Sequence, residues 1–71
     1  MDEKTKFLVL LGDNVRKLRI SKSYSQQELA DNLNFAKSTI QRIENGKLNP
    51  TIWALKHIAS ALEVDLDMLI R

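Results

Sequence analysis

Polar side chains that could bind a nucleic acid recur at helical spacing between residues 37 and 45, in the segment KSTIQRIEN. Ile40 and Ile43 define the buried side of a helix there, because they are spaced to share one face. At about 100° per residue, the polar side chains that then point outward are Ser38, Gln41, Arg42 and Asn45, with Lys37 at the flank of the first turn. An arginine can donate to O6 and N7 of one guanine, and lysine, serine and glutamine side chains also reach base edges. The segment therefore carries the chemistry needed to read a DNA major groove.

Cations are clustered before this segment. Between residues 15 and 22 the chain has four cations and no acid, namely Arg16, Lys17, Arg19 and Lys22. The net charge of the whole chain is only +2, so this clustering, and not the total, favours an anionic partner. A cationic run on a helix is equally consistent with a solvated face, so phosphate binding by Arg16 remains one of two interpretations. Asn45 and Lys47, which follow the 37–45 segment, are placed to hold further phosphates.

Glu44 differs from its neighbours, because its helical angle places it near the buried side of the segment. An unpaired carboxylate there would be costly, so Glu44 needs a cation. Arg19 flanks an apolar stripe upstream and is the natural partner. We expect this ion pair to be structural, with phosphate binding by Arg19 as the alternative.

Two short helices with an abrupt joint must hold these side chains. Ser25 and Glu28 form a capping box that begins a helix running to about Leu33. Asn34 tolerates the left-handed conformation at a helix end, and a second helix then runs to a stop at Gly46. So short a connection predicts the steep crossing of a helix-turn-helix.

Helical patterns also account for the rest of the chain. Apolar spacing predicts a first helix from about Thr5 to Lys22, with Phe7 and Leu8 extending its buried stripe. After Pro50, a fourth helix has a predicted buried face made by Ile52, Leu55, Ile58, Ala59 and Leu62. Asp65 is the expected cap of a short last helix through Ile70. No segment alternates with a period of two, so we expect one all-α, five-helix domain over residues 1–71.

Composition excludes several classes of function. The chain has no cysteine, so it has neither disulfides nor thiolate metal sites. Its longest apolar run, residues 7–11, is too short to cross a membrane or to form a signal-peptide core, which predicts a cytoplasmic protein. His57 is the only histidine, and there is no glycine-rich phosphate loop or metal-ligand cluster. We therefore expect no enzyme activity, no cofactor and no bound metal.

Four segments resemble, in order and spacing, the Cro and phage-repressor type of helix-turn-helix domain, also called the XRE family. They are LGDNVRKLR, SQQELADNL, STIQRIENGKLNP and ALKHIASALEVDLDML, and together they cover about residues 11–69. The resemblance implies a compact lambda-repressor-like fold whose second and third helices form the helix-turn-helix. It also implies a sequence-specific DNA-binding transcriptional regulator, with a recognition helix at about residues 36–45 in the major groove of a palindromic operator.

The resemblance also assigns individual residues. It implies base contacts at Lys37, Ser38 and Arg42, beside which Gln41 is a further candidate from its outward position. Gln26 resembles the glutamine that binds a phosphate at the start of the second helix, and the family carries an arginine–glutamate pair at the positions of Arg19 and Glu44.

Two departures from the family pattern affect helix ends. Ser23, Asn34 and Glu63 stand where members commonly have glycine, so these turns need a left-handed backbone from residues that adopt it less readily. Ala36 occupies a position where the family often has a capping Ser or Thr. Alanine at an N-cap stabilises a helix less than those residues do, by about 1 kcal/mol.

Apolar residues outside the expected core predict a homodimer. Its interface is expected on the outward edge of the fourth helix and on the last helix, with contributions from Trp53, Leu66, Leu69 and Ile70. Double-stranded DNA is the other expected partner, and no small-molecule effector is implied. A protein-interaction module or an antitoxin of the same fold remains the alternative function.

Overall fold

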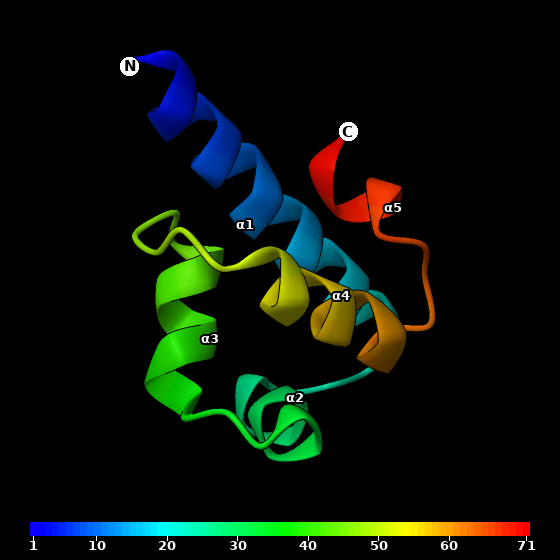
Figure 1. The fold of residues 1–71 in the computed structure, drawn as a ribbon. Helices are drawn as coiled ribbons and strands as arrows, with labels where there is room; N and C mark the ends of the chain where they lie inside the picture. Colours follow the sequence, from blue (N-terminus) through cyan, green and yellow to red (C-terminus); the bar gives the residue numbers. More distant parts are fainter.

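In the computed structural model, which describes residues 1–71, five helices surround one apolar core (Figure 1). They are α1 (Glu3–Ser21), α2 (Gln26–Leu33), α3 (Lys37–Glu44), α4 (Ile52–Ala61) and α5 (Asp67–Ile70). The all-α, five-helix architecture expected from the sequence is confirmed. None of these helices is both long and apolar enough to span a lipid bilayer.

Helix α1 begins earlier than its apolar pattern suggests. Asp2 caps it by accepting a hydrogen bond from the backbone N–H of Thr5 at 2.8 Å, so the helix starts at Glu3 and not at Thr5. This backbone hydrogen bond also holds the pKa of the Asp2 carboxyl below its ordinary value. The first two turns contain no other strong boundary signal, and a single capping residue therefore sets where the helix starts.

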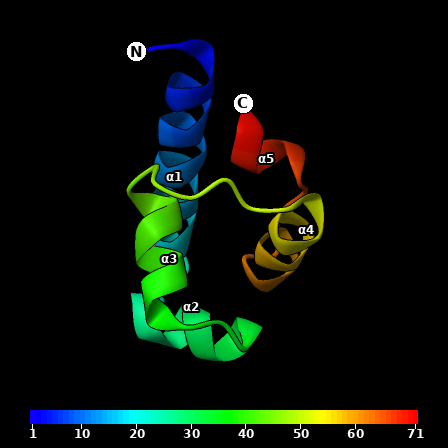
Figure 2. The same cartoon turned by 60° about the vertical axis from the view of Figure 1, so that its left-hand side comes forward.

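The helix-turn-helix is built from local signals in α2 and the turn after it. Both hydrogen bonds of the capping box are present, from Glu28 N to Ser25 Oγ and from Ser25 N to Glu28 Oε1. The second of these keeps the pKa of the Glu28 carboxyl below its ordinary value. Asn34 ends α2 in the left-handed conformation, with φ 57°. In Figure 2, α2 lies next to the N-terminal end of α3, at the end of the molecule far from the chain's N-terminus.

Helix α3 begins at Lys37, and its N-cap residue, Ala36, supplies no side-chain hydrogen bond. Tertiary packing must therefore hold this eight-residue helix, because isolated helices of this length are unstable in water. Its principal neighbours are α1 and α2. Ile40 and Ile43 are fully buried between them.

One core of buried apolar residues connects all five helices. It comprises Leu8, Leu11, Val15, Leu29, Ala30, Ile40, Ile43, Leu55, Ile58, Ala59, Leu62 and Leu69. Two expected members are absent, since Ile52 is 70% exposed and Phe7 is 44% exposed. Ile52 is the first residue of α4 and Phe7 the fifth of α1, so both lie near the start of their helices.

The last helix is shorter than expected. Helix α5 begins at Asp67 after Leu66, and the Asp65 side chain does not cap it. Instead, the Asp65 carbonyl oxygen accepts a hydrogen bond from the Met68 N–H at 3.0 Å. The prediction of Asp65 as the N-cap was therefore wrong, because the chain makes this turn with backbone groups.

Ser23, Asn34 and Glu63 all have a left-handed backbone, with φ of 61°, 57° and 58°. Each lies just after a helix, where a residue without a side chain would be under less strain. Only asparagine among the three adopts this conformation readily.

We predict that Ser23→Gly increases the free energy of unfolding by about 0.5–1 kcal/mol. Glycine removes the strain of a left-handed L-residue, about 1–2 kcal/mol, but it loses more backbone entropy on folding, which offsets part of the gain. Chemical denaturation measures the change. Asn34→Gly is the matched control and should change stability by less. A larger gain for Asn34→Gly than for Ser23→Gly would contradict the assignment of strain.

Candidate nucleic-acid interface

The predicted base-contacting residues lie together on the outward face of α3. Lys37, Ser38, Gln41 and Arg42 are all exposed, while Ile40, Ile43 and Glu44 form the buried side of the same helix. The four side chains therefore share one surface, as the helical spacing predicts. Nothing in the chain covers this surface.

The cations of this surface are unpaired within the chain. The ion pairs present are Lys17–Asp13, Arg19–Glu44, Lys22–Glu63 and Arg71–Asp67. Lys37, Arg42 and Lys47 take part in none of them, and neither does Arg16 of α1. These charged groups are thus available to an external anion.

The only acid in α3 is removed from the surface by burial. The Glu44 side chain is 2% exposed and its carboxylate faces Arg19, whose side chain is 11% exposed. Arg19 Nε donates to Glu44 Oε2 at 2.7 Å, and Arg19 Nη2 donates to Oε1 at 3.1 Å. Such a bidentate pair has more geometric specificity than a single ion pair. The exposed face of α3 consequently carries positive charge without a compensating acid.

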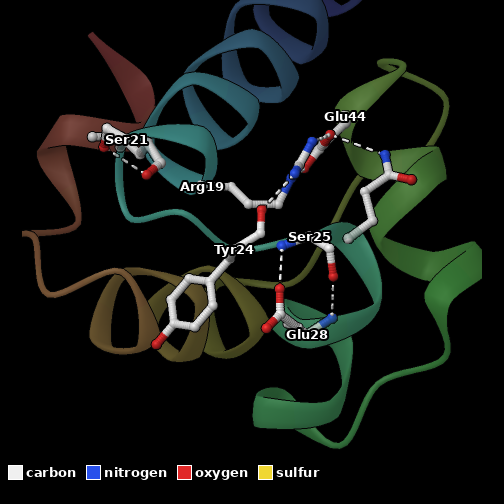
Figure 3. Close-up of polar contacts among 8 residues, drawn as sticks. Arg19, Ser21, Tyr24, Ser25, Glu28 and Glu44 are labelled. Carbon is white, nitrogen blue, oxygen red and sulfur yellow. Dashed lines mark hydrogen bonds and ion pairs between the residues drawn. The ribbon is translucent and has the colours of Figure 1, made fainter.

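Arg19 also fixes the segment between α1 and α2. Its Nη1 donates to the carbonyl oxygen of Tyr24 at 2.7 Å, immediately before the capping box (Figure 3). One guanidinium therefore connects the end of α1, the start of the helix-turn-helix and the end of α3. The ion pair expected between Arg19 and Glu44 is present, and no buried side-chain polar atom lacks a partner.

Gln26 has a role within the chain that sequence analysis missed. Its Nε2 donates to Glu44 Oε1 at 3.1 Å, so the first residue of α2 is tied to the last residue of α3. An amide nitrogen has two N–H groups, so one remains for a phosphate. The hydrogen bond to Glu44 orients this amide before any ligand binds.

Gly12 is a second feature that sequence analysis missed. A Cβ atom built there would lie 2.4 Å from the Ile43 carbonyl oxygen and 2.7 Å from the Glu44 carbonyl oxygen. The backbones of α1 and α3 therefore meet at Gly12, and the space between them is too small for any side chain at this position. A glycine inside an otherwise regular helix was the available signal, since it weakens the helix unless close packing requires it.

The residues predicted for a dimer interface differ in their exposure. Leu69 is fully buried in the core, so its assignment to the interface was wrong: α5 packs this side chain inward against its own chain. Leu66 is half-buried and packs on the core. Trp53 is 66% exposed, with its ring 4.7 Å from that of His57, and Ile70 is 39% exposed.

Comparison with known proteins identifies the family. The sequence model of HTH_3, described as a helix-turn-helix, matches residues 15–69, which is more than half of the chain. The chain belongs to this family. Its members that resemble the chain are transcriptional regulators and not enzymes, and the resemblance to XRE-type regulators drawn from the sequence is confirmed.

Three relatives illustrate the similarity. The prophage-derived HTH-type transcriptional regulator YonR of Bacillus subtilis is 34% identical over 62 residues, covering 87% of this chain and 57% of YonR. The controller protein C.AhdI from Aeromonas hydrophila, of a restriction-modification system, has a TM-score of 0.85 at 30% identity, covering 89% of this chain and 96% of that one. SinR in a crystal structure with DNA has a TM-score of 0.78 at 35% identity, covering 83% and 95%.

This HTH_3 chain spans only part of some of its relatives. It covers 57% of YonR and 56% of the SinR protein of Bacillus subtilis. The likeness to C.AhdI and to the SinR chain crystallised with DNA, by contrast, covers nearly the whole of those chains. The shared part is therefore the helix-turn-helix unit itself.

We predict that Gly12→Ala destabilises the fold by about 1–3 kcal/mol, because overpacking against a backbone outweighs the gain of about 1 kcal/mol in helix propensity. Denaturant midpoints test this. The difference in stability between Arg16→Gly and Arg16→Ala, at an exposed and unpaired position of the same helix, measures the propensity effect alone. A stabilisation by Gly12→Ala equal to that difference would show that α1 and α3 do not meet at Gly12.

We predict that Glu44→Ala lowers the free energy of unfolding by about 3–5 kcal/mol, because it leaves the Arg19 guanidinium buried without its carboxylate. Arg42→Ala, on the exposed side of the same helix, is the control and should change stability by no more than about 0.5 kcal/mol. Denaturant midpoints that coincide for the two variants would mean that the pair contributes no more than a surface contact.

Proposed function

We propose that this HTH_3 chain is a sequence-specific DNA-binding regulator that inserts α3 into the major groove of its operator. The observation that carries the proposal is the charge arrangement of α3. Its outward face has Lys37 and Arg42 exposed and unpaired, while its single acid, Glu44, is neutralised in a buried ion pair. An anionic groove rich in acceptors is the ligand that this face fits.

Base reading is assigned to the outward residues of α3. Arg42 donates in bidentate fashion to a guanine, and Lys37 donates to a guanine or to a phosphate. Ser38 and Gln41 have shorter side chains that can donate and accept hydrogen bonds, so each is compatible with more than one base. The lack of a side-chain cap at Ala36 supports this orientation, because it leaves backbone N–H groups at the start of α3 open to acceptors on the DNA.

Phosphate binding is assigned to residues around α3. Gln26 at the start of α2, Asn45 and Lys47 after α3, and Arg16 on α1 surround the proposed base-reading residues and fix the protein on the duplex. The hydrogen bond between Gln26 and Glu44 supports this assignment, since it links the phosphate-binding amide rigidly to the recognition helix. Contacts of this kind position the protein and do not distinguish bases.

Two copies of the chain are proposed to bind one palindromic operator. A single short recognition helix covers only a few base pairs, and two-fold related helices about 34 Å apart reach successive major grooves. Trp53, Leu66 and Ile70 remain the candidate dimer contacts from the sequence once Leu69 is excluded. The SinR–DNA crystal structure supports DNA binding by this unit, and C.AhdI supports a regulatory role.

We expect Arg42→Ala to weaken binding to the operator by about 1–3 kcal/mol and to relax the preference at one base pair. The operator is first selected from random duplexes, and affinities for operator and random DNA are then measured over a series of salt concentrations. Equal losses on the two DNAs would make Arg42 a phosphate contact. Failure of the wild type to select any sequence would favour a protein-interaction module.

Two variants serve as controls in the same assay. Lys47→Ala should weaken binding to all sequences and reduce the salt dependence of log K by about one unit of slope. Gln26→Ala should also weaken binding to all sequences but leave the slope unchanged, because a neutral amide releases no counterion.

A further inference from the structure

The N-terminal part of α1 is apolar on every side, although the chain covers only part of it. The run FLVLL, residues 7–11, places apolar side chains all round the helix. Leu8 and Leu11 are buried in the core, whereas Phe7, Val9 and Leu10 are 39–44% exposed. A helix that is hydrophobic all round is normally buried. We call the exposed residues Phe7, Val9 and Leu10 the α1 patch.

The α1 patch lies at one end of the molecule. In Figures 1 and 2, the start of α1 extends past the end of α3 and past α5, while α2 lies at the opposite end. The carbonyl oxygens of Leu69 and Arg71, at the end of α5, accept hydrogen bonds from Asn14 Nδ2 at 2.9 and 3.1 Å, so α5 covers α1 only up to this level. Helix α2 is therefore remote from the patch, whereas the C-terminal end of α3 lies beside it, because Glu44 and Asn45 line one groove with Val9 and Leu10.

The shape of the α1 patch suits another copy of itself. Leu10 and Lys6 form a ridge between two grooves, one of about 420 Å³ on the side of Val9 and one of about 580 Å³ on the side of Phe7. Helices pack by setting the ridge of one into the groove of the other. A two-fold axis beside Leu10 would set each ridge into a groove of the other copy.

The charges beside the α1 patch are also self-complementary. Lys6 and Asp13 are two helical turns apart and so lie on the same side of α1, with Leu10 near their midpoint. When two copies of α1 pack antiparallel, Lys6 of each faces Asp13 of the other. Lys6 has no ion-pair partner in its own chain, and Asp13 has only the exposed Lys17.

We infer that the α1 patch binds the same patch of a second copy, with the two α1 helices antiparallel across Leu10. Gly46, just after α3, lies against Val9 on one side of α1, and a two-fold axis keeps that side common to both copies. The two α3 helices then lie on one side of the dimer, with the two helix-turn-helix units at its outer ends. This inference extends the proposed two-copy binding but concerns a contact that exists without DNA.

Cysteine cross-linking tests the geometry, because the chain has no cysteine of its own. In Leu10→Cys, two thiols near the axis lose two protons and two electrons to added diamide and form one disulfide, which requires Cβ atoms about 3.5–4.5 Å apart. Most of this variant should become a covalent dimer at micromolar concentration. Ile20→Cys, at an exposed apolar position near the other end of α1, is the matched control and should stay mostly monomeric. Equal yields would overturn the inference.

Light scattering over a concentration series tests the energetics. Leu10→Glu should raise the dimer Kd at least about tenfold, and Lys6→Asp should raise it less, while the circular dichroism of both stays that of the wild type because both side chains are exposed. A wild type that stays monomeric at hundreds of micromolar, or dissociation by Trp53→Glu but not by Leu10→Glu, would overturn the inference. Dimers that bind no DNA would contradict only the proposed function, and monomers that bind the operator would contradict only this contact.

Discussion

The buried ion pair between Arg19 and Glu44 is the constraint on which the rest of the molecule depends. Glu44 would repel DNA if it lay on the exposed surface of α3, and it would be unstable if it lay in the core without a partner. The bidentate contact with Arg19 resolves both problems, since it accommodates the carboxylate inside the fold and holds α1 against α3. The third hydrogen bond of Arg19, to Tyr24, extends this control to the start of α2.

Gly12 and Gln26 make further contacts that hold the end of α3 in place. Gly12 allows the α1 backbone to approach the carbonyl oxygens of Ile43 and Glu44. It lies about two helical turns before Arg19, which contacts the same end of α3. Gln26 ties α2 to Glu44 from the other side. The last turn of α3 is thus held by contacts from two helices. Its first turn, which begins at an uncapped Ala36, depends on the turn after Asn34 and on the packing of Ile40.

Local signals in the sequence predict most of the helix boundaries, because a cap or a left-handed turn involves residues close together in the chain. The capping box at Ser25 and the left-handed turn at Asn34 are of this kind, whereas Ala36 provides no capping signal for the start of α3. Burial is harder to predict, since it depends on where other helices end. Leu69 and Phe7 are both apolar, yet Leu69 of α5 is buried in the core and Phe7 of α1 is exposed. The hydrogen bond from Gln26 to Glu44 joins residues 18 positions apart, and no sequence pattern indicates it.

Stability and specificity are consequently assigned to opposite sides of one eight-residue helix. Ile40, Ile43 and Glu44 make the contacts that hold α3 in place, whereas Lys37, Ser38, Gln41 and Arg42 make no side-chain hydrogen bond or ion pair within the chain. Substitution on the outward side leaves no buried group without a partner, so its effect on folding is small. Substitution on the inward side creates a cavity or an unpaired charge. The outward residues can therefore change while the fold stays the same, whereas a change in the Arg19–Glu44 pair would alter the position of the residues that we propose read the DNA.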